Sequence, residues 1–178
     1  VKTDKGINSD IILYNNTQNI IKISDFRSND PIQNWLETEI NSKKPTKSLS
    51  KIWYARKRSS KRKTGRKITL EEFAKVRNSF LYEPTLVLSA PRDLWTLKSQ
   101  GGQYEKSFGV NGEVPVRYSK SDFEICLLAL SFYLKICDQS KFDAKENTEL
   151  SFLHRFRWHL LSLCGLYFES QQKRISAK

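Results

Sequence analysis

A block of positive charge beside aromatic residues is the strongest chemical signal in this sequence. The segment from Lys51 to Lys67 reads KIWYARKRSSKRKTGRK and contains nine Lys or Arg residues and no Asp or Glu. The chain has a formal net charge of +12, so the remainder carries only +3 (12 − 9 = 3). Mobile cations bind phosphates with release of counterions, and neighbouring aromatic rings stack on bases. The segment therefore predicts a nucleic-acid contact, with a solvated loop of no role and a localisation signal as alternatives.

The residues expected to contact nucleic acid combine both features. Trp53 and Tyr54 are expected to orient the strand, and the cations that follow are expected to hold phosphates. The candidate residues are Trp53, Tyr54, Arg56, Lys57, Arg58, Lys61, Arg62 and Lys63.

A second polar cluster lies nearer the N-terminus, between two apolar segments. Amides and carboxylates at this density serve as helix caps, as a hydrogen-bond network or as a ligand site. Caps account for Asp30 and for Asp25, but they leave Asn16 and Gln18 unexplained. The sequence therefore predicts a network or a binding site here. Its members are Asn15, Asn16, Gln18, Asn19, Ser24, Asp25, Arg27, Asn29, Asp30 and Gln33.

No motif for metal binding or nucleophilic catalysis is recognisable. His154 and His159 are five residues apart, so they would lie on different faces of a helix and could not chelate one metal. Cys126, Cys137 and Cys164 lie in apolar helical patterns without CxxC spacing, which indicates reduced core residues. There is no GxSxG motif and no phosphate-binding glycine loop. We expect no metal and no cofactor, and the catalytic residues, if any, are unassigned.

Helices are the elements expected to position these residues. Seven Gly and five Pro are few for a turn-rich β-sandwich. Asp30 followed by Pro31 predicts the start of one helix, and Thr69 with Glu72 predicts a capping box at the start of another. Two long core helices are predicted over 119–170.

The remaining elements are short and few. A brief helix is expected around 8–14, and short strands are expected near 20–24 and 50–57. Residues 57–67 are expected to form a basic loop. The fold class is therefore mainly α with minor β, as one mostly helical domain over 1–178.

Composition also bears on where the chain acts. No run of about 18 apolar residues is present, so no membrane span is expected. No secretory signal is recognisable, and a cytoplasmic location is expected. A chain that begins Val-Lys-Thr and contains no Met is expected to be a piece of a longer protein.

Four motifs in order resemble one protein family. NNTQNIIKISDFRSNDPIQNWLETEI, KIWYARKRS, ITLEEFAKVRNSF and GGQYEKSFG resemble successive segments of the abortive infection phage resistance (AIPR) family. The resemblance spans roughly residues 8–110. It places Asn16, Gln18, Asp25 and Gln33 in the polar motif, Tyr54, Arg56 and Lys57 in the aromatic-basic arm, and Tyr104 and Phe108 in a later motif.

This resemblance implies a bacterial cytoplasmic protein that limits phage spread by killing or arresting the infected cell. We expect this chain to contribute nucleic-acid binding, with DNA or RNA and the rest of a longer protein as partners. One alternative is a fragment of a defence nuclease whose catalytic residues lie upstream, or form through proximity of Asp25, Asp30 and Glu37. Another is an interaction domain without enzymatic activity. In that alternative the segment FLHRFRWHLLSLCGLYF is the face of a homodimer, with Phe152, Trp158 or Tyr167 exposed.

Overall fold

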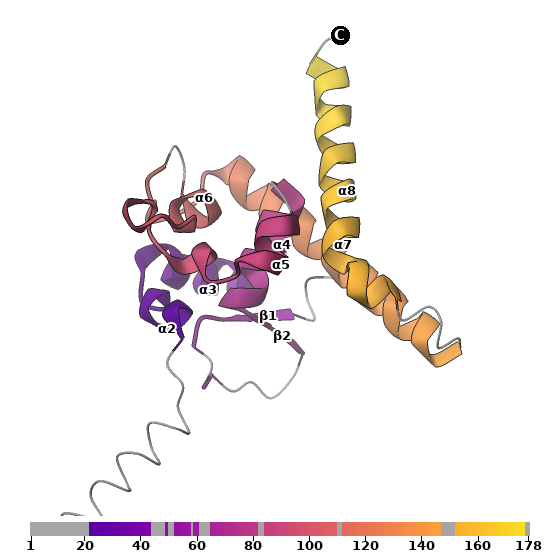
Figure 1. The fold of residues 1–178 in the computed structure, drawn as a ribbon, viewed down its shortest axis with the longest axis horizontal. Helices are drawn as coiled ribbons and strands as arrows, with labels where there is room; N and C mark the ends of the chain where they lie inside the picture. The colour runs from indigo at the N-terminus through magenta and orange to yellow at the C-terminus, as the bar shows by residue number, and fades with distance from the viewer. Residues whose placement is uncertain are drawn as a thin grey trace, which may run out of the picture.

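The computed structural model describes most of the chain and shows a mainly helical fold (Figure 1). The described residues are 22–43, 49, 52–57, 59–60, 65–81, 84–109, 112–146 and 152–176. The helix expected around 8–14 lies outside them. The elements are α2 (Ile23–Arg27), α3 (Pro31–Lys43), β1 (Ile52–Ala55), β2 (Arg66–Thr69), α4 (Leu70–Leu81), α5 (Pro84–Ser89), η2 (Asp93–Trp95), η3 (Lys98–Gln100), α6 (Tyr104–Phe108), α7 (Lys120–Glu146) and α8 (Phe152–Ser176).

Helix α2 replaces the strand expected near residues 20–24, in the part that the structure describes. The backbone N–H of Lys22 donates to the carboxylate of Asp25 at 2.8 Å, which closes the first turn. The Ser24 hydroxyl donates to Glu71 of α4 at 2.7 Å and ties this turn to the body. The β-branched residues of this segment favour a strand. The local cap and the bond to Glu71, 47 residues away, stabilise a helix instead.

Helix α3 begins at Pro31, as the sequence predicts. The backbone carbonyl of Asp30 accepts bonds from the N–H groups of Gln33 at 2.9 Å and Asn34 at 3.1 Å. Ile32 and Leu36, one turn apart, are fully buried and fix which face of the helix meets the core.

Strands β1 and β2 form a two-stranded parallel sheet in which Tyr54 pairs with Ile68. The strand at 50–57 is confirmed, while β2 was not predicted and shortens the basic loop, because Arg66 and Lys67 belong to the strand. Gly65, with φ of 92°, turns the chain immediately before β2. Only Ile68 of β2 is buried, so the pattern of the four residues gives little strand signal.

Helix α4 occupies the centre of the fold. Its start is as predicted, since the N–H of Glu72 donates to the Thr69 hydroxyl at 3.1 Å. Phe73, Ala74 and Val76 are almost fully buried. The helix contacts both long C-terminal helices and the sheet, so it links the regions of the molecule.

The sequence predicts two long helices near the C-terminus, and the structure shows them as α7 and α8, which pack on one another (Figure 1). Tyr133 of α7 stacks on Trp158 of α8, with ring centroids 5.3 Å apart. Where α8 crosses α4, a Cβ atom at Gly165 would lie 1.8 Å from the carbonyl oxygen of Phe80. Glycine therefore permits this close approach of two helices. Beyond the crossing, α8 extends away from the helical body.

Short helical turns connect α4 to α7. Gly101, with φ of 80°, ends η3 (Lys98–Gln100). The N–H of Gln103 then donates to the carbonyl of Asp93 at 2.7 Å, and α6 follows. This connection places the rings of Tyr104 and Phe108 in the core beside Trp95.

The structure also bears on the membrane and cysteine predictions. Among the described residues, no helix is long and apolar enough to cross a membrane. Cys126 and Cys137 are buried as free thiols, and Cys164 is half-buried. Burial raises the pKa of the Cys126 thiol, which keeps it protonated and unreactive.

Candidate functional site

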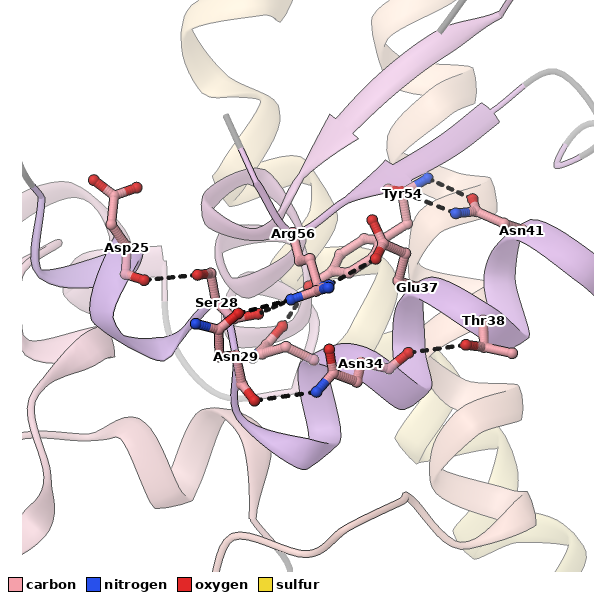
Figure 2. A network of polar contacts seen from close by, with 10 residues as sticks. Asp25, Ser28, Asn29, Asn34, Glu37, Thr38, Asn41, Tyr54 and Arg56 are labelled. Carbon is pink, nitrogen blue, oxygen red and sulfur yellow. Dashed lines mark hydrogen bonds and ion pairs between the residues drawn. The ribbon is translucent and has the colours of Figure 1, made fainter. Parts of the chain in front are cut away.

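Arg56 stands at the centre of a polar network beneath β1 (Figure 2). Its Nε donates to the Glu37 carboxylate at 2.7 Å. One terminal nitrogen donates to the carbonyl of Ser28 at 3.0 Å and to the side chain of Asn29 at 2.9 Å. The guanidinium thus fastens the end of β1 to α3 and to the turn that precedes α3.

Asn41 holds the other side of the same strand. Its amide nitrogen donates to the carbonyl of Tyr54 at 3.0 Å, and its amide oxygen accepts from the N–H of Tyr54 at 2.9 Å. The side chain therefore pairs with the strand backbone as a neighbouring strand would. This bond pair fixes the position of β1 relative to α3 (Figure 2).

A buried chain of hydrogen bonds continues inward from Tyr54. The Tyr54 hydroxyl donates to Gln33 Oε1 at 2.5 Å, and Gln33 Nε2 contacts the Tyr104 hydroxyl at 3.4 Å. The Tyr104 hydroxyl in turn donates to Asp30 at 2.7 Å. We call the set that surrounds Arg56 and this chain the anchor network; it comprises Ser28, Asn29, Asp30, Gln33, Glu37, Asn41, Tyr54, Arg56 and Tyr104.

Burial keeps the hydroxyl groups of Tyr54 and Tyr104 protonated, so both act as hydrogen-bond donors. The ring of Tyr54 lies edge-on to Phe73 at 5.4 Å, and Arg27 lies over the ring of Tyr104 at 5.0 Å. Burial, and then the neighbouring Tyr104 and Glu37, raise the pKa of Tyr54 well above 10. Burial also raises the pKa of Tyr104, assisted by its bond to Asp30.

The far end of the basic loop has its own anchor. Arg66 of β2 forms an ion pair with Glu72 at 3.0 Å and donates to the Tyr133 hydroxyl at 3.3 Å. The Tyr133 hydroxyl donates to the same carboxylate at 2.6 Å. Arg56 and Arg66, the arginines that flank the loop, therefore each have a carboxylate partner within the fold.

Trp53 and Lys67 form a contact between the two strands. The Lys67 ammonium lies 5.9 Å from the centre of the Trp53 ring and donates to the Ser60 carbonyl at 3.0 Å. Trp53 is half-buried, whereas the ring of Tyr54 has no exposed surface. Lys57, which follows Arg56, is exposed.

The structure brings together the predicted residues of three family motifs. Gln33, Tyr54, Arg56 and Tyr104 meet in the anchor network, and Phe108 packs against Tyr104 with ring centroids 5.0 Å apart. The Asp25 carboxylate closes the first turn of α2, and the Asp25 backbone carbonyl accepts from the hydroxyl of Ser28, a member of the network, at 2.7 Å (Figure 2). Eight of the predicted site residues lie outside the described part of the chain: Asn15, Asn16, Gln18, Asn19, Arg58, Lys61, Arg62 and Lys63. The binding roles of all these residues stay predictions.

Glu37 and Asn41 belong to the network, although neither was predicted from the sequence to be a member of the polar cluster. Together with Gln33 they recur every fourth residue, so they form one polar stripe along α3. That spacing was the available signal. A polar stripe on a helix usually faces solvent, however, and only the position of β1 turns this one inward.

The carboxylates of the nuclease alternative have separate partners. Asp25 accepts from the backbone of Lys22, Asp30 from Tyr104, and Glu37 from Arg56. Within the described ranges, no group of three or more His, Cys, Asp or Glu residues is placed to hold a metal ion.

Comparisons with known proteins identify the family. Neither the curated proteins nor the solved structures that we compared with the chain include a match. The family model described as AIPR protein matches residues 1–157, which is most of the chain. The match includes every motif that meets in the anchor network, and it confirms the resemblance drawn from the four motifs. The chain belongs to the AIPR family.

Proposed function

We propose that this chain contributes a nucleic-acid-binding surface to phage defence. Membership of the AIPR family suggests the defence role. The binding surface is the basic loop between β1 and β2, with the cations from Lys57 to Lys63 as phosphate contacts. The same family membership favours a bacterial protein, and DNA or RNA is the proposed partner.

One structural observation, in addition to the charge of the loop, supports it as the phosphate-binding segment. The arginines that flank it, Arg56 and Arg66, are occupied by Glu37 and Glu72. Between them, residues 57–63 contain five further cations and no acid. The fold thus fixes both ends of a segment whose own sequence offers no neutralising carboxylate. A fixed frame lowers the entropy lost when such a segment binds phosphates.

Trp53 is the proposed stacking residue of the arm. It retains exposed surface, whereas Tyr54 is enclosed by Phe73 and Gln33. The cation of Lys67 beside the indole would favour a phosphate near a base stacked there. Tyr54 and Arg56 then act by fixing the arm.

A salt series with matched variants tests this proposal. In one variant, Lys57, Arg58, Lys61, Arg62 and Lys63 become Gln. In the control, five exposed cations elsewhere become Gln: Lys98, Arg117, Lys120, Lys135 and Arg155. Each variant loses three Lys and two Arg, so both lower the formal net charge of +12 by five.

Affinity for single- and double-stranded DNA and RNA is measured between about 50 and 200 mM salt. The unmodified chain should show a steep salt slope. The loop variant should lose up to about 4.5 units of that slope, because it lacks five cations and each phosphate contact contributes about 0.9 on duplex DNA. The control variant should lose less than one unit. Equal losses in both variants, or no binding by the unmodified chain, would refute the loop as the contact.

Self-association through α8 is a second candidate function, supported by its outer face. Phe156, Leu163, Leu166 and Tyr167 are exposed to 50–67 % and recur at helical spacing. Trp158 is buried in the fold, so it contributes nothing to such a face. Light scattering at increasing concentration tests this function: a dimer that Leu163→Glu converts to a monomer supports it, and a monomeric unmodified chain refutes it.

A further inference from the structure

A pocket of about 600 Å³ lies between α2, α4 and the turn that follows α5. Among the described residues, Lys22, Lys75 and Arg92 contribute three cations to its lining, and Glu71 contributes the one carboxylate. Ile23 and Pro91 line its apolar side. We call it the Arg92 pocket. Its volume lies within the range of small-molecule sites.

The charge of the pocket is incompletely matched. The Glu71 carboxylate already accepts from the Lys22 ammonium at 2.9 Å and from the Ser24 hydroxyl at 2.7 Å. The side chains of Lys75 and Arg92 make no hydrogen bond or ion pair with the part of the chain that the structure describes. With Glu71 and Lys22 paired, the lining retains two positive charges.

The ionisation state of Glu71 supports a lining with two unmatched positive charges. Partial burial by itself would raise the pKa of the carboxyl group. Hydrogen bonds from Lys22 and Ser24, and the charges of Lys22 and Lys75, outweigh burial and lower the pKa. Glu71 is therefore ionised at neutral pH, and it neutralises one cation of the three.

The apolar side of the pocket is also open to a ligand. Ile23 is exposed to 42 %, and Pro91 is exposed. Trp95, which is 5 % exposed, also lines the pocket. A ligand that fits must therefore present an anion to Lys75 and Arg92 and an apolar surface to Ile23 and Pro91.

We infer that the Arg92 pocket binds a small organic phosphate of the size and character of a mononucleotide. The guanidinium of Arg92 matches two phosphate oxygens, and Lys75 adds a second positive charge. The nucleobase of the ligand packs on Ile23 and Pro91. Glu71 has lone pairs beyond its two bonds, which accept from a hydroxyl or amino group of the ligand. The residues proposed to bind this ligand differ from those proposed to contact nucleic acid.

Calorimetric titration with AMP, GMP, CMP and UMP tests the inference. At least one of the four should bind, and at least tenfold more tightly than ribose 5-phosphate, which lacks the base, or than inorganic phosphate. The double variant Lys75→Gln with Arg92→Gln should weaken that binding at least tenfold. The matched control, Lys98→Gln with Arg117→Gln, should leave it unchanged. Failure of all four nucleotides to bind overturns the inference, and so does equal weakening by both variants.

A second variant separates the apolar contact from the charge. Ile23→Ser should weaken nucleotide binding at least threefold and leave the affinity for ribose 5-phosphate unchanged. Equal weakening for both ligands would show that the base does not lie on this side, and would overturn the proposed orientation.

The same variants distinguish this site from the basic loop. The loop variant should bind the mononucleotide normally, and the Lys75/Arg92 variant should keep the salt slope for oligonucleotides. If the Lys75/Arg92 variant loses as much oligonucleotide affinity as the loop variant, the pocket belongs to the nucleic-acid surface and the inference fails. If only the loop prediction fails, the mononucleotide site stands.

Discussion

The anchor network and the Arg92 pocket both set cations beside aromatic rings and carboxylates, with opposite results. In the network, Arg56 has a carboxylate, a carbonyl and an amide as acceptors. In the pocket, Lys75 and Arg92 face a single carboxylate that Lys22 and Ser24 already occupy. Full pairing turns a cation into a structural element, whereas incomplete pairing leaves it available to a ligand. The number of Lys and Arg residues in a segment therefore does not show which of them can bind a ligand. That depends on whether the fold gives each cation an acceptor.

Removing Gln33 should produce the largest loss of stability in this comparison. Gln33→Leu keeps the volume but leaves the buried hydroxyl of Tyr54 without its acceptor and removes a contact of Tyr104. We expect the free energy of unfolding to fall by about 2–4 kcal/mol, since each buried unsatisfied group costs about 1–3 kcal/mol. Urea denaturation measures it. The double variant with Tyr54→Phe should recover part of the loss, because it removes the orphaned hydroxyl; strictly additive losses would contradict the network.

Arg56→Gln should have the next largest effect. It removes the ion pair with Glu37, whose side chain retains 28 % exposure and can be rehydrated. We therefore expect a loss of about 1–2 kcal/mol in the free energy of unfolding. The neighbouring change Lys57→Gln, at an exposed position, should cost less than about 0.5 kcal/mol. Equal losses at the two positions would show that Arg56 is not a structural cation.

Alkaline pH should lower the free energy of unfolding, in part through Tyr54. Burial raises the pKa of Tyr54 above its usual value of 10, so the folded chain keeps a proton that the unfolded chain releases. Stability is unaffected below pH 10 and falls above it, by up to about 1.4 kcal/mol per pH unit for each such tyrosine. Urea midpoints recorded between about pH 8 and pH 11 should decline less steeply in Tyr54→Phe. An identical decline would contradict the assignment.

The pocket substitutions should have the smallest effect on stability. Lys75→Gln and Arg92→Gln each should change the free energy of unfolding by less than about 0.5 kcal/mol, because no hydrogen bond within the described fold is lost. Thermal unfolding of the single variants measures this. A loss above about 1 kcal/mol at either position would show a structural role and remove the contrast with Arg56.

The starts of the helices could be predicted from the sequence because a helix cap depends on residues that are close together along the chain. Pro31 after Asp30 and the Thr69–Glu72 cap begin α3 and α4 where expected. The strand β2 was missed because its pairing with β1 is a contact between segments, and Arg66 and Lys67 resemble loop residues. Asp30 and Glu72 lie at helix starts, as predicted. Their side chains also accept hydrogen bonds from tyrosines far away in the sequence, which the sequence did not indicate.

The sequence by itself determined the helical class, the apolar faces, the concentration of charge at 51–67 and the AIPR motifs. Each depends on composition or on spacing within one segment. Only the tertiary structure decided that Tyr54 and Arg56 face inward to α3 and that Arg66 meets Glu72 and Tyr133. It alone also placed Lys75 and Arg92 around a pocket. The pairing of a charge depends on groups brought together from distant segments, and the fold supplies those partners.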